Sequence, residues 1–328
     1  MDPLIQEYLR GKNLLITGAS GYLASNLAKL LQNIPFTLRR LTRKSALPSL
    51  HGKAIVEDIQ GEISDVSVWN QAMQGIDIVF HFASQTNVYI ADKDPESDYQ
   101  ANVQPMLHML EACKNIENYP DILFAGTSTQ MGLPQSLPVN EKAQDNPITI
   151  YDLHKLMAEN YLKYYARMGI VRGVTLRLTN VYGPGPKSSS ENRGFLNAMI
   201  SRSLLGKSPT LYGDGKHIRD YIYIEDVLSA FLKATLNISS LNQKHFVLGS
   251  GEGHSISEAL HHIADRATLK LNKKINVKIV KPPEGLSPIE DRNFIADSRS
   301  FSRLTGWQPL NSLTEGIEKT IETFLRDE

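Results

Sequence analysis

The stretch Asn13-Leu14-Leu15-Ile16-Thr17-Gly18-Ala19-Ser20-Gly21-Tyr22-Leu23-Ala24 decides the fold of this chain. A short apolar strand runs directly into a glycine-rich turn, and a helical pattern with leucines on one face follows. Glycines allow the tight turn and let backbone amides approach a pyrophosphate, while a helix N-terminus adds amides and a favourable dipole. A glycine pattern alone would indicate only a strand-to-helix turn, but this combination predicts a dinucleotide-binding unit.

Short strands alternate with helices as far as residue 180. The predicted strands are Asn13–Thr17, Thr37–Thr42, Ala54–Glu57, Asp77–Phe82, Ile122–Ala125 and Val174–Leu178. Apolar strands in such an alternation favour a parallel sheet covered by helices on both faces. The expected fold class is therefore α/β, a doubly wound parallel sheet (Rossmann) with a smaller C-terminal substrate-binding lobe.

The second half of the chain has a different character. A Gly- and Pro-rich loop at 183–190 is followed by a predicted helix from about Arg193 to Leu205 and a strand at Tyr221–Ile224. A helix at Asp226–Leu236 and a strand at His245–Leu248 come next. We expect an NAD(P)-binding Rossmann domain over residues 1–180. A substrate-binding lobe over 181–328 would be interleaved with elements that return to the Rossmann sheet.

The composition narrows the class of protein. Thirty-five basic residues balance 35 acidic ones, which gives no indication of a nucleic-acid partner or of binding to a membrane surface. The single cysteine, Cys113, excludes an intrachain disulfide and suits a reducing compartment. No apolar run approaches the roughly 20 residues of a membrane span, and the N-terminus lacks the order of a signal peptide. We expect a cytoplasmic protein without a metal site.

The residues that follow the predicted strands indicate how the dinucleotide is bound. NAD-specific sites usually have an acid at the end of the second strand, but Thr42 and Arg43 stand there. A hydroxyl and a guanidinium suit the 2′-phosphate of NADP, whereas the alternative interpretation is a solvated basic strand end. We expect NADP(H), with NAD(H) as the alternative. The cofactor-binding residues predicted from these positions are Gly18, Ser20, Gly21, Tyr22, Leu23, Thr42, Arg43, Glu62, Ile63, Phe82, Ala83 and Ser84.

Three polar side chains form a candidate catalytic set. The spacing of Tyr151 and Lys155 places both on one helical face, where the ammonium would lower the ordinary tyrosine pKa of about 10. Thr127 follows the fifth predicted strand and would hydrogen-bond the substrate oxygen, with Ser128 and Thr129 as alternatives. Each feature alone is common, since turn hydroxyls often end strands. Together with the glycine loop they predict catalysis by Thr127, Tyr151 and Lys155.

With these residues assembled, the chain resembles the extended short-chain dehydrogenases/reductases, a family of nucleotide-sugar epimerases, dehydratases and ketoreductases. The resemblance spans almost the whole length. It rests on the features above and on Arg177-Leu178-Thr179-Asn180-Val181-Tyr182-Gly183-Pro184-Gly185, Tyr212-Gly213-Asp214-Gly215, Arg219-Asp220 and Thr305-Gly306-Trp307-Gln308-Pro309. It implies cofactor contacts for Asn102, Tyr151, Lys155, Leu178 and Val181, and substrate contacts for Thr127, Asn180, Asn192, Arg193, Arg219 and Arg292. The two arginines last named would hold the diphosphate.

Within this family the chain is most similar to the 4-ketoreductases of dTDP-linked 6-deoxyhexoses. The 4,6-dehydratases carry Asp-Glu directly after the catalytic threonine, where this chain has Ser128-Thr129. The missing acid at Thr42 points to exchangeable NADPH. The expected function is NADPH-dependent reduction of the C4 keto group of a nucleotide-linked (dTDP) 4-keto-6-deoxyhexose. The alternatives are an NAD-dependent nucleotide-sugar 4-epimerase and a non-catalytic NADP-binding protein. Relatives dimerise through helices, so we expect a homodimer that uses the helix Tyr151–Arg167.

Overall fold

The computed structural model describes residues 2–116, 119–186 and 194–326. Its centre is a seven-stranded sheet in the order β11-β6-β5-β4-β1-β2-β3, in which all neighbours are parallel. These strands are β1 (Asn13–Thr17), β2 (Thr37–Thr42), β3 (Ile55–Gln60), β4 (Ile78–His81), β5 (Asp121–Thr127), β6 (Arg172–Leu178) and β11 (Lys244–Leu248). The strand order reverses between β1 and β4, which is where doubly wound sheets bind ligands. The predicted fold class is confirmed.

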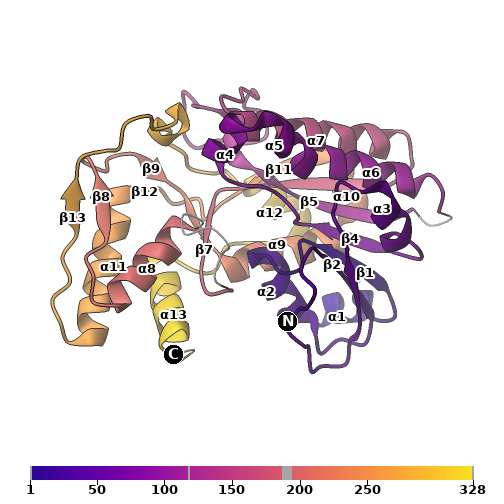
Figure 1. Cartoon of the computed structure of the whole chain (residues 1–328), viewed down its shortest axis with the longest axis horizontal. Helices are drawn as coiled ribbons and strands as arrows, with labels where there is room; N and C mark the ends of the chain where they lie inside the picture. The colour runs from indigo at the N-terminus through magenta and orange to yellow at the C-terminus, as the bar shows by residue number, and fades with distance from the viewer. Residues whose placement is uncertain (1, 117–118, 187–193, 327–328) are drawn as a thin grey trace.

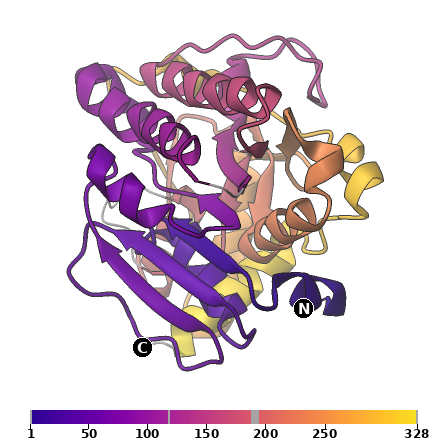
Figure 2. The same ribbon diagram turned by 90° about the vertical axis from the view of Figure 1, so that its right-hand side faces the viewer.

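Two layers of helices cover the sheet (Figures 1 and 2). Leu15 and Phe124 pack among α3, α6 and α7 on one face, whereas Ile16 and Phe80 pack among α2 and α9 on the other. The opposite assignment of Leu15 and Ile16 follows from the two-residue period of a strand. The helices of these layers are α1 (Pro3–Leu9), α2 (Tyr22–Leu31), α3 (Val66–Ala72), α4 (Val88–Lys93), α5 (Pro95–Asn102), α6 (Gln104–Cys113), α7 (Ile150–Arg167), α9 (Ile224–Leu236), α10 (Ile238–Leu241) and α12 (Arg299–Thr305).

A smaller lobe lies beside the carboxyl ends of the strands (Figure 1, left). It contains three two-stranded pairs, of which β10 joins β7, β12 joins β9 and β13 joins β8. Its elements are β7 (Asn180–Tyr182), α8 (Phe195–Leu204), β8 (Thr210–Tyr212), β9 (Ile218–Arg219), β10 (Tyr221–Tyr223), β12 (His254–Ser255), α11 (Ile256–Leu271), β13 (Lys278–Val280) and α13 (Leu313–Arg326), with 3₁₀ turns η1 (Ser128–Met131) and η2 (Pro288–Asp291). Because β11 returns to pair with β6, the two halves of the chain are interleaved. The domain boundary at residue 180 stays a prediction.

Some predicted boundaries differ from the structure for identifiable reasons. β1 and β2 have the predicted limits, but β3 continues to Gln60 because it pairs with β2 up to Thr42. β10 stops at Tyr223 because Ile224 already begins α9. Residues beyond Leu248, for which no element is predicted, form two long helices. One of them, α11, begins at a capping box of Ser255 and Glu258 that is readable in the sequence. None of the described helices combines the length and apolarity needed to cross a bilayer.

Candidate active site

The glycine loop joins the carboxyl ends of β1 and β4. Gly18 has a φ of +65°, and a Cβ added there would lie 2.8 Å from Ala83 Cα, so only glycine fits. Just before it, Thr17 Oγ1 accepts the backbone N–H groups of Phe82 and Ala83, each at 3.1 Å. The backbone at Gly18 therefore runs directly along the backbone after β4. This close approach is what a dinucleotide cradle requires, and the residues present fit such a ligand.

His81 at the end of β4 belongs to the same junction. Its Nδ1 lies 2.9 Å from Thr17 Oγ1, and burial, followed by the charge of Lys155, lowers the pKa of His81 to about 3. Since the Thr17 hydroxyl already accepts two N–H groups, its own proton points to His81 Nδ1. His81 is therefore neutral and holds the loop in place.

Two of the four basic residues at the end of β2 are already paired with acidic side chains. Arg39 and Arg40 are occupied by cross-strand carboxylates, because Arg39 Nη2 lies 2.8 Å from Glu57 and Arg40 Nε lies 2.6 Å from Asp58. Thr42 is buried, and its Oγ1 accepts the N–H of Lys44 at 3.1 Å.

Arg43 is exposed at this strand end, and Glu62 is exposed on the loop after β3. Ile63 uses its carbonyl to accept the Trp69 Nε1 proton at 2.7 Å. Of the basic run around β2, Arg43 and Lys44 are thus the cations without a carboxylate partner among the described residues.

Tyr151 and Lys155 stand on the first turns of α7, above β5. Both are buried, and Lys155 Nζ lies 4.1 Å from the centre of the Phe124 ring. Burial lowers the pKa of Lys155 to about 7, although the charges of Asp98 and Glu159 raise it. A lysine that exchanges its proton near neutral pH is suited to tune a neighbouring phenol.

Asp98 is held by a set of buried polar groups. It accepts hydrogen bonds from Gln85 Nε2 at 2.8 Å and Asn102 Nδ2 at 3.0 Å, and His154 Nδ1 lies 2.7 Å from its other oxygen. Asn102 in turn accepts the Ser84 hydroxyl proton at 2.5 Å. The segment after β4 is therefore tied to α5 and α7. Neither Asp98 nor His154 is a predicted site residue.

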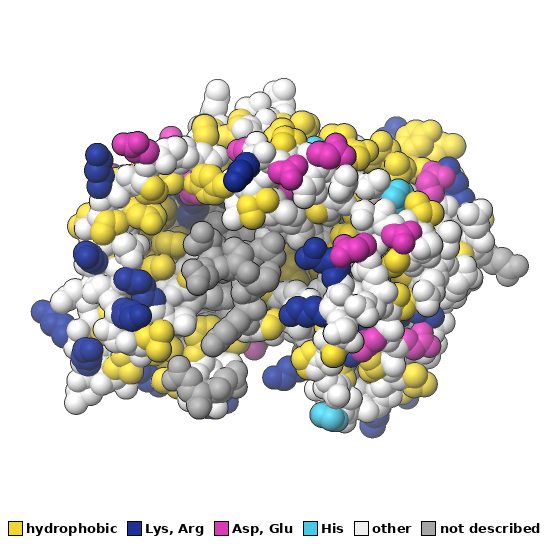
Figure 3. All heavy atoms as spheres, viewed as in Figure 1, with side chains coloured by type: hydrophobic (Ala, Val, Ile, Leu, Met, Phe, Trp, Pro, Cys, Tyr) yellow, Lys and Arg dark blue, Asp and Glu magenta, His cyan; other side chains and the backbone are white. Residues whose placement is uncertain are grey.

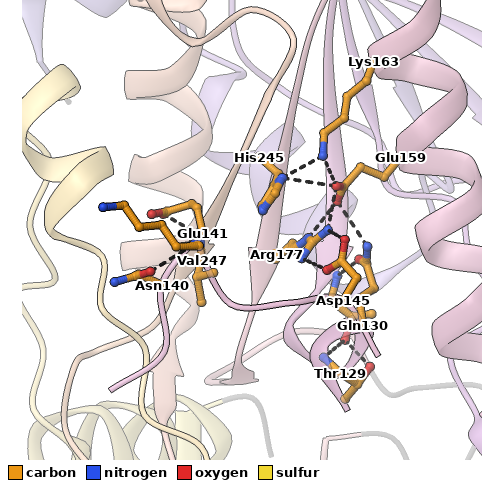
Figure 4. A network of polar contacts seen from close by, with 12 residues as sticks. Thr129, Gln130, Asn140, Glu141, Asp145, Glu159, Lys163, Arg177, His245 and Val247 are labelled. Atoms are coloured by element: carbon orange, nitrogen blue, oxygen red, sulfur yellow. Dashed lines mark hydrogen bonds and ion pairs between the residues drawn. The ribbon is translucent and has the colours of Figure 1, made fainter. Parts of the chain in front are cut away.

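Thr127 ends β5. A buried ionic network of Gln130, Glu159, Arg177 and Asp145 fixes its backbone (Figure 4). The backbone N–H of Thr127 donates to Gln130 Oε1 at 3.0 Å, and Gln130 Nε2 donates to Glu159 at 3.2 Å. Arg177 lies between Glu159, at 2.7 Å, and Asp145, at 2.5 Å. Although burial raises it, the hydrogen bonds and charge of Arg177 lower the pKa of Glu159 to about 2. The network connects the turn after β5 to α7, so it sets Thr127 relative to Tyr151.

The predicted substrate contacts fall into three groups. Arg219 and Arg292 are buried side by side, and Arg219 Nη2 donates to the Glu290 carbonyl at 2.7 Å. Asn180 Nδ2 donates a hydrogen bond to the Asp220 carbonyl at 3.1 Å. Asn192 and Arg193 lie outside the described residues.

Arg292 reaches the turn after β5, because its Nη1 donates to Ser128 Oγ at 3.3 Å. Burial, and next the charge of Arg219, lower the pKa of Arg292 to about 10. On the face shown in Figure 3, Lys and Arg side chains occur on both lobes, on either side of the middle of that face. The two buried arginines are the cations whose position could favour an anionic ligand.

The glycine loop also touches the second lobe. Tyr22 Oη donates to the Gly183 carbonyl at 2.9 Å, and Asn26 Nδ2 donates to the Pro184 carbonyl at 3.2 Å. Leu178 is buried at the end of β6, and Val181 is half-buried in β7. The side chain of Tyr22 therefore serves as a joint between the loop after β1 and the loop after β7.

Comparison with known proteins agrees with this architecture. The sequence profile of the NAD dependent epimerase/dehydratase family matches residues 14–249. The chain therefore belongs to this family of extended short-chain dehydrogenases/reductases, as its sequence motifs predicted.

Individual relatives match over nearly the whole length. A putative UDP-glucose 4-epimerase of Methanocaldococcus jannaschii is 29% identical over 94% of this chain and 97% of its own. The structure of UDP-glucose 4-epimerase from Thermotoga maritima with UDP-glucose has 25% identity and a TM-score of 0.83, covering 96% of this chain and 99% of that one. The Thermus thermophilus UDP-glucose 4-epimerase complex with NAD has 26% identity and a TM-score of 0.80, covering 95% and 99%.

Replacing Gly18 by alanine tests the cradle. The added Cβ would meet Ala83 Cα at 2.8 Å, so we expect dinucleotide affinity to fall at least tenfold, about 1.4 kcal/mol. Titration with NADH and NADPH by fluorescence measures the affinity. Gly169→Ala is the matched control, because Gly169 also has a positive φ but nothing within 4 Å of its added Cβ. Unchanged affinity in Gly18→Ala would show that the ligand does not use this loop.

Replacing Arg177 by methionine tests the buried network. The change leaves Glu159 buried without its guanidinium, so we expect a loss of about 3–5 kcal/mol in the free energy of unfolding at pH 7. Urea unfolding measures it, and Arg266→Met, which removes a half-exposed pair with Glu318, should cost about 1 kcal/mol or less. Because Glu159 has a folded pKa of about 2 against 4.5, the contribution of this carboxylate is complete above pH 4.5 and disappears as the pH falls toward 2. A loss that did not shrink over this range would contradict the assignment.

Proposed function

We propose that the protein is a nucleotide-sugar 4-epimerase that oxidises and re-reduces C4 of a nucleoside-diphosphate hexose with a retained nicotinamide dinucleotide. The observation that carries the proposal is that Lys155, one turn after Tyr151 in α7, lies over Phe124 of β5, the strand that ends at Thr127. Lys155 also acts electrostatically on His81, whose ring lies 2.9 Å from Thr17 Oγ1. The similarity to UDP-glucose 4-epimerases over nearly the full length supports the choice of reaction.

Each residue has a defined task in this reaction. When bound, a nicotinamide dinucleotide supplies reversible hydride transfer, and Gly18, Gly21 and the N-terminus of α2 hold its pyrophosphate. Tyr151 exchanges a proton with the C4 oxygen, because the charge of Lys155 one turn later favours the phenolate. The Thr127 hydroxyl donates to the same oxygen and stabilises the charge that develops on it.

The substrate is anchored away from the reacting carbon. Arg219 and Arg292 are buried cations, and a diphosphate would offset their burial. Fixing the diphosphate at these arginines uses remote binding energy to orient the sugar. An epimerase must present both faces of the C4 ketone to one dinucleotide, so the hold on the sugar has to be looser than the hold on the diphosphate.

A second candidate is the NADPH-dependent 4-ketoreductase expected from the sequence. One observation favours it, namely that Thr42, and no acid, ends β2 while Arg43 is exposed beside it. Because Arg39 and Arg40 are paired with carboxylates, a 2′-phosphate of NADP would have to be bound by Thr42, Arg43 and Lys44. The relatives that carry the family likeness are named as epimerases, and one is described with NAD, so NAD(H) is the cofactor we propose first.

The released cofactor discriminates the two candidates. Freshly purified protein is denatured, and the dinucleotide in the supernatant is identified by mass spectrometry. Near-stoichiometric NAD, together with conversion of UDP-glucose without net change in NADH absorbance, would support the epimerase. An empty site that consumes NADPH with a 4-keto sugar nucleotide would establish the reductase and overturn the epimerase.

Replacing Tyr151 by phenylalanine removes only the phenolic oxygen. We expect kcat to fall about 10²–10⁴-fold, because the proton on the C4 oxygen loses its exchange partner, while dinucleotide binding persists. Initial rates and a fluorescence titration measure the two quantities. Tyr164→Phe on the same helix is the control, since Tyr164 is 55% exposed. Normal turnover in Tyr151→Phe would refute the mechanism.

The expected homodimer also stays a prediction.

A further inference from the structure

Asp152 directly follows Tyr151 in the first turn of α7, and its side chain is fully buried. Neither carboxyl oxygen has a hydrogen-bond partner of normal geometry among the described residues. The helix N-terminus does not use this side chain, because the backbone N–H of Asp152 donates to Thr149 Oγ1 at 3.2 Å. A buried acid whose oxygens have only the hydroxyls of Thr129 and Thr149 and one backbone group near them costs free energy when ionised, so its place beside the proposed reacting tyrosine needs a functional reason.

Two hydroxyls lead from this carboxyl to the proposed substrate oxygen. Thr129 Oγ1 lies 2.8 Å from Thr127 Oγ1, and Thr127 Oγ1 also accepts the backbone N–H of Thr129 at 3.2 Å. The Thr129 hydroxyl interacts with Asp152 as well, where it lowers the pKa of the carboxyl. Asp152, Thr129 and Thr127 thus form a continuous series of polar groups, called here the hydroxyl row.

Counting donors fixes what the row can do. Thr127 has one hydroxyl proton, which can go either to Thr129 Oγ1 or to the substrate oxygen. It goes to the substrate when Thr129 donates its own proton to Thr127. Thr129 Oγ1 then has only lone pairs to direct at Asp152, so the Asp152 carboxyl has to donate a proton to it. An ionised carboxylate only accepts and draws the Thr129 proton toward itself, whereas a protonated carboxyl donates.

We propose that Asp152 is a positioning residue that must be protonated for turnover, because only the protonated carboxyl directs the Thr127 hydroxyl to the C4 oxygen through Thr129. The proposal rests on the proposed function, in which Thr127 donates to that oxygen. It requires no net transfer of a proton to the substrate from Asp152, since Tyr151 performs that exchange. The row sets the direction of the Thr127 hydroxyl.

The surroundings of Asp152 agree with a protonated state. Burial is the largest influence and raises the pKa of the carboxyl, while the hydroxyls of Thr129 and Thr149 and the charge of Arg292 lower it. Among the residues that the structure describes, Arg292 is the charged group outside α7 that acts on Asp152, and Arg219 and Glu290 act on Arg292 in turn. A group whose pKa is raised loses its proton as the pH rises, so the rate should decline on the alkaline side of that pKa.

The test is the pH profile of kcat with UDP-glucose. We expect the wild-type rate to decline with rising pH and Asp152→Asn to lose that decline, because an amide supplies an N–H donor at every pH. Asp152→Leu leaves the row without a donor and is expected to lower kcat about 10- to 100-fold at every pH, with KM within about threefold. Thr129→Val removes the other acceptor of the Thr127 proton, so its rate should no longer decline with rising pH. Thr129→Ser restores the hydroxyl and should restore the wild-type profile. A decline that persists in Asp152→Asn, or a Thr129→Val profile equal to wild type, would overturn the proposal.

Infrared spectroscopy tests the row without turnover. The C=O band of a protonated carboxyl, identified by its absence in Asp152→Asn, is followed over pH. In Thr129→Val the titration of this band should move to higher pH, because the hydroxyl that lowers the pKa of Asp152 is gone. If UDP-glucose is not converted but the band shifts, the proposed function fails while the row stands. An unshifted band overturns the row. Thermal denaturation checks that each variant is folded.

Discussion

The site depends on the burial of one ammonium group, that of Lys155, between the sheet and α7. A buried cation is costly, so the surrounding charges determine whether it is tolerated. Here the Phe124 ring lies beneath it at 4.1 Å, and the charges of Asp98 and Glu159 raise its pKa against the effect of burial. The resulting pKa of Lys155 is about 7, so a change in a neighbouring charge can shift the balance between its protonated and neutral forms near neutral pH. The arrangement of the residues at the carboxyl ends of the strands therefore depends on how Asp98 and Glu159 are held.

Each of the two acids is fixed by a different part of the fold. Asp98 accepts from Gln85 and Asn102 and contacts His154, so it ties the segment after β4 to α5 and α7. Glu159 binds Arg177 of β6, which also holds Asp145. The same Glu159 accepts from Gln130, which fixes the Thr127 backbone. The electrostatic support of the lysine and the position of the threonine therefore share one network, and a change in either would be felt by both.

The sequence predicts the local parts of this arrangement and misses the pairings. β1, the glycine turn and the Tyr151/Lys155 spacing follow from short-range patterns, and they were readable because period and turn chemistry act within a few residues. The network of Gln130, Glu159 and Arg177 joins residues on three elements, and no local pattern encodes which partners meet.

The basic run at the end of β2 shows the same limit. Arg39 and Arg40 look like free cations in the sequence, yet the parallel register of β2 and β3 sets Glu57 and Asp58 opposite them. Asp152 is visible in the sequence, but an acidic residue in the first turn of a helix is common and indicates no function by itself. Only its burial without a hydrogen bond of normal geometry distinguishes it.

The proposed reacting groups alone do not separate an epimerase from a reductase, because tyrosine, lysine and threonine would serve hydride transfer in either direction. The difference lies in whether the dinucleotide leaves after one transfer. In this fold the loop proposed to bind the pyrophosphate is fastened to the second lobe, since Tyr22 donates to the Gly183 carbonyl. A Cβ at Gly185 would lie 2.5 Å from the Tyr22 ring, so that loop packs directly on the tyrosine. If the dinucleotide binds as proposed, opening the loop to release it would have to break these Tyr22 contacts as well, which supports the proposed retention of the cofactor.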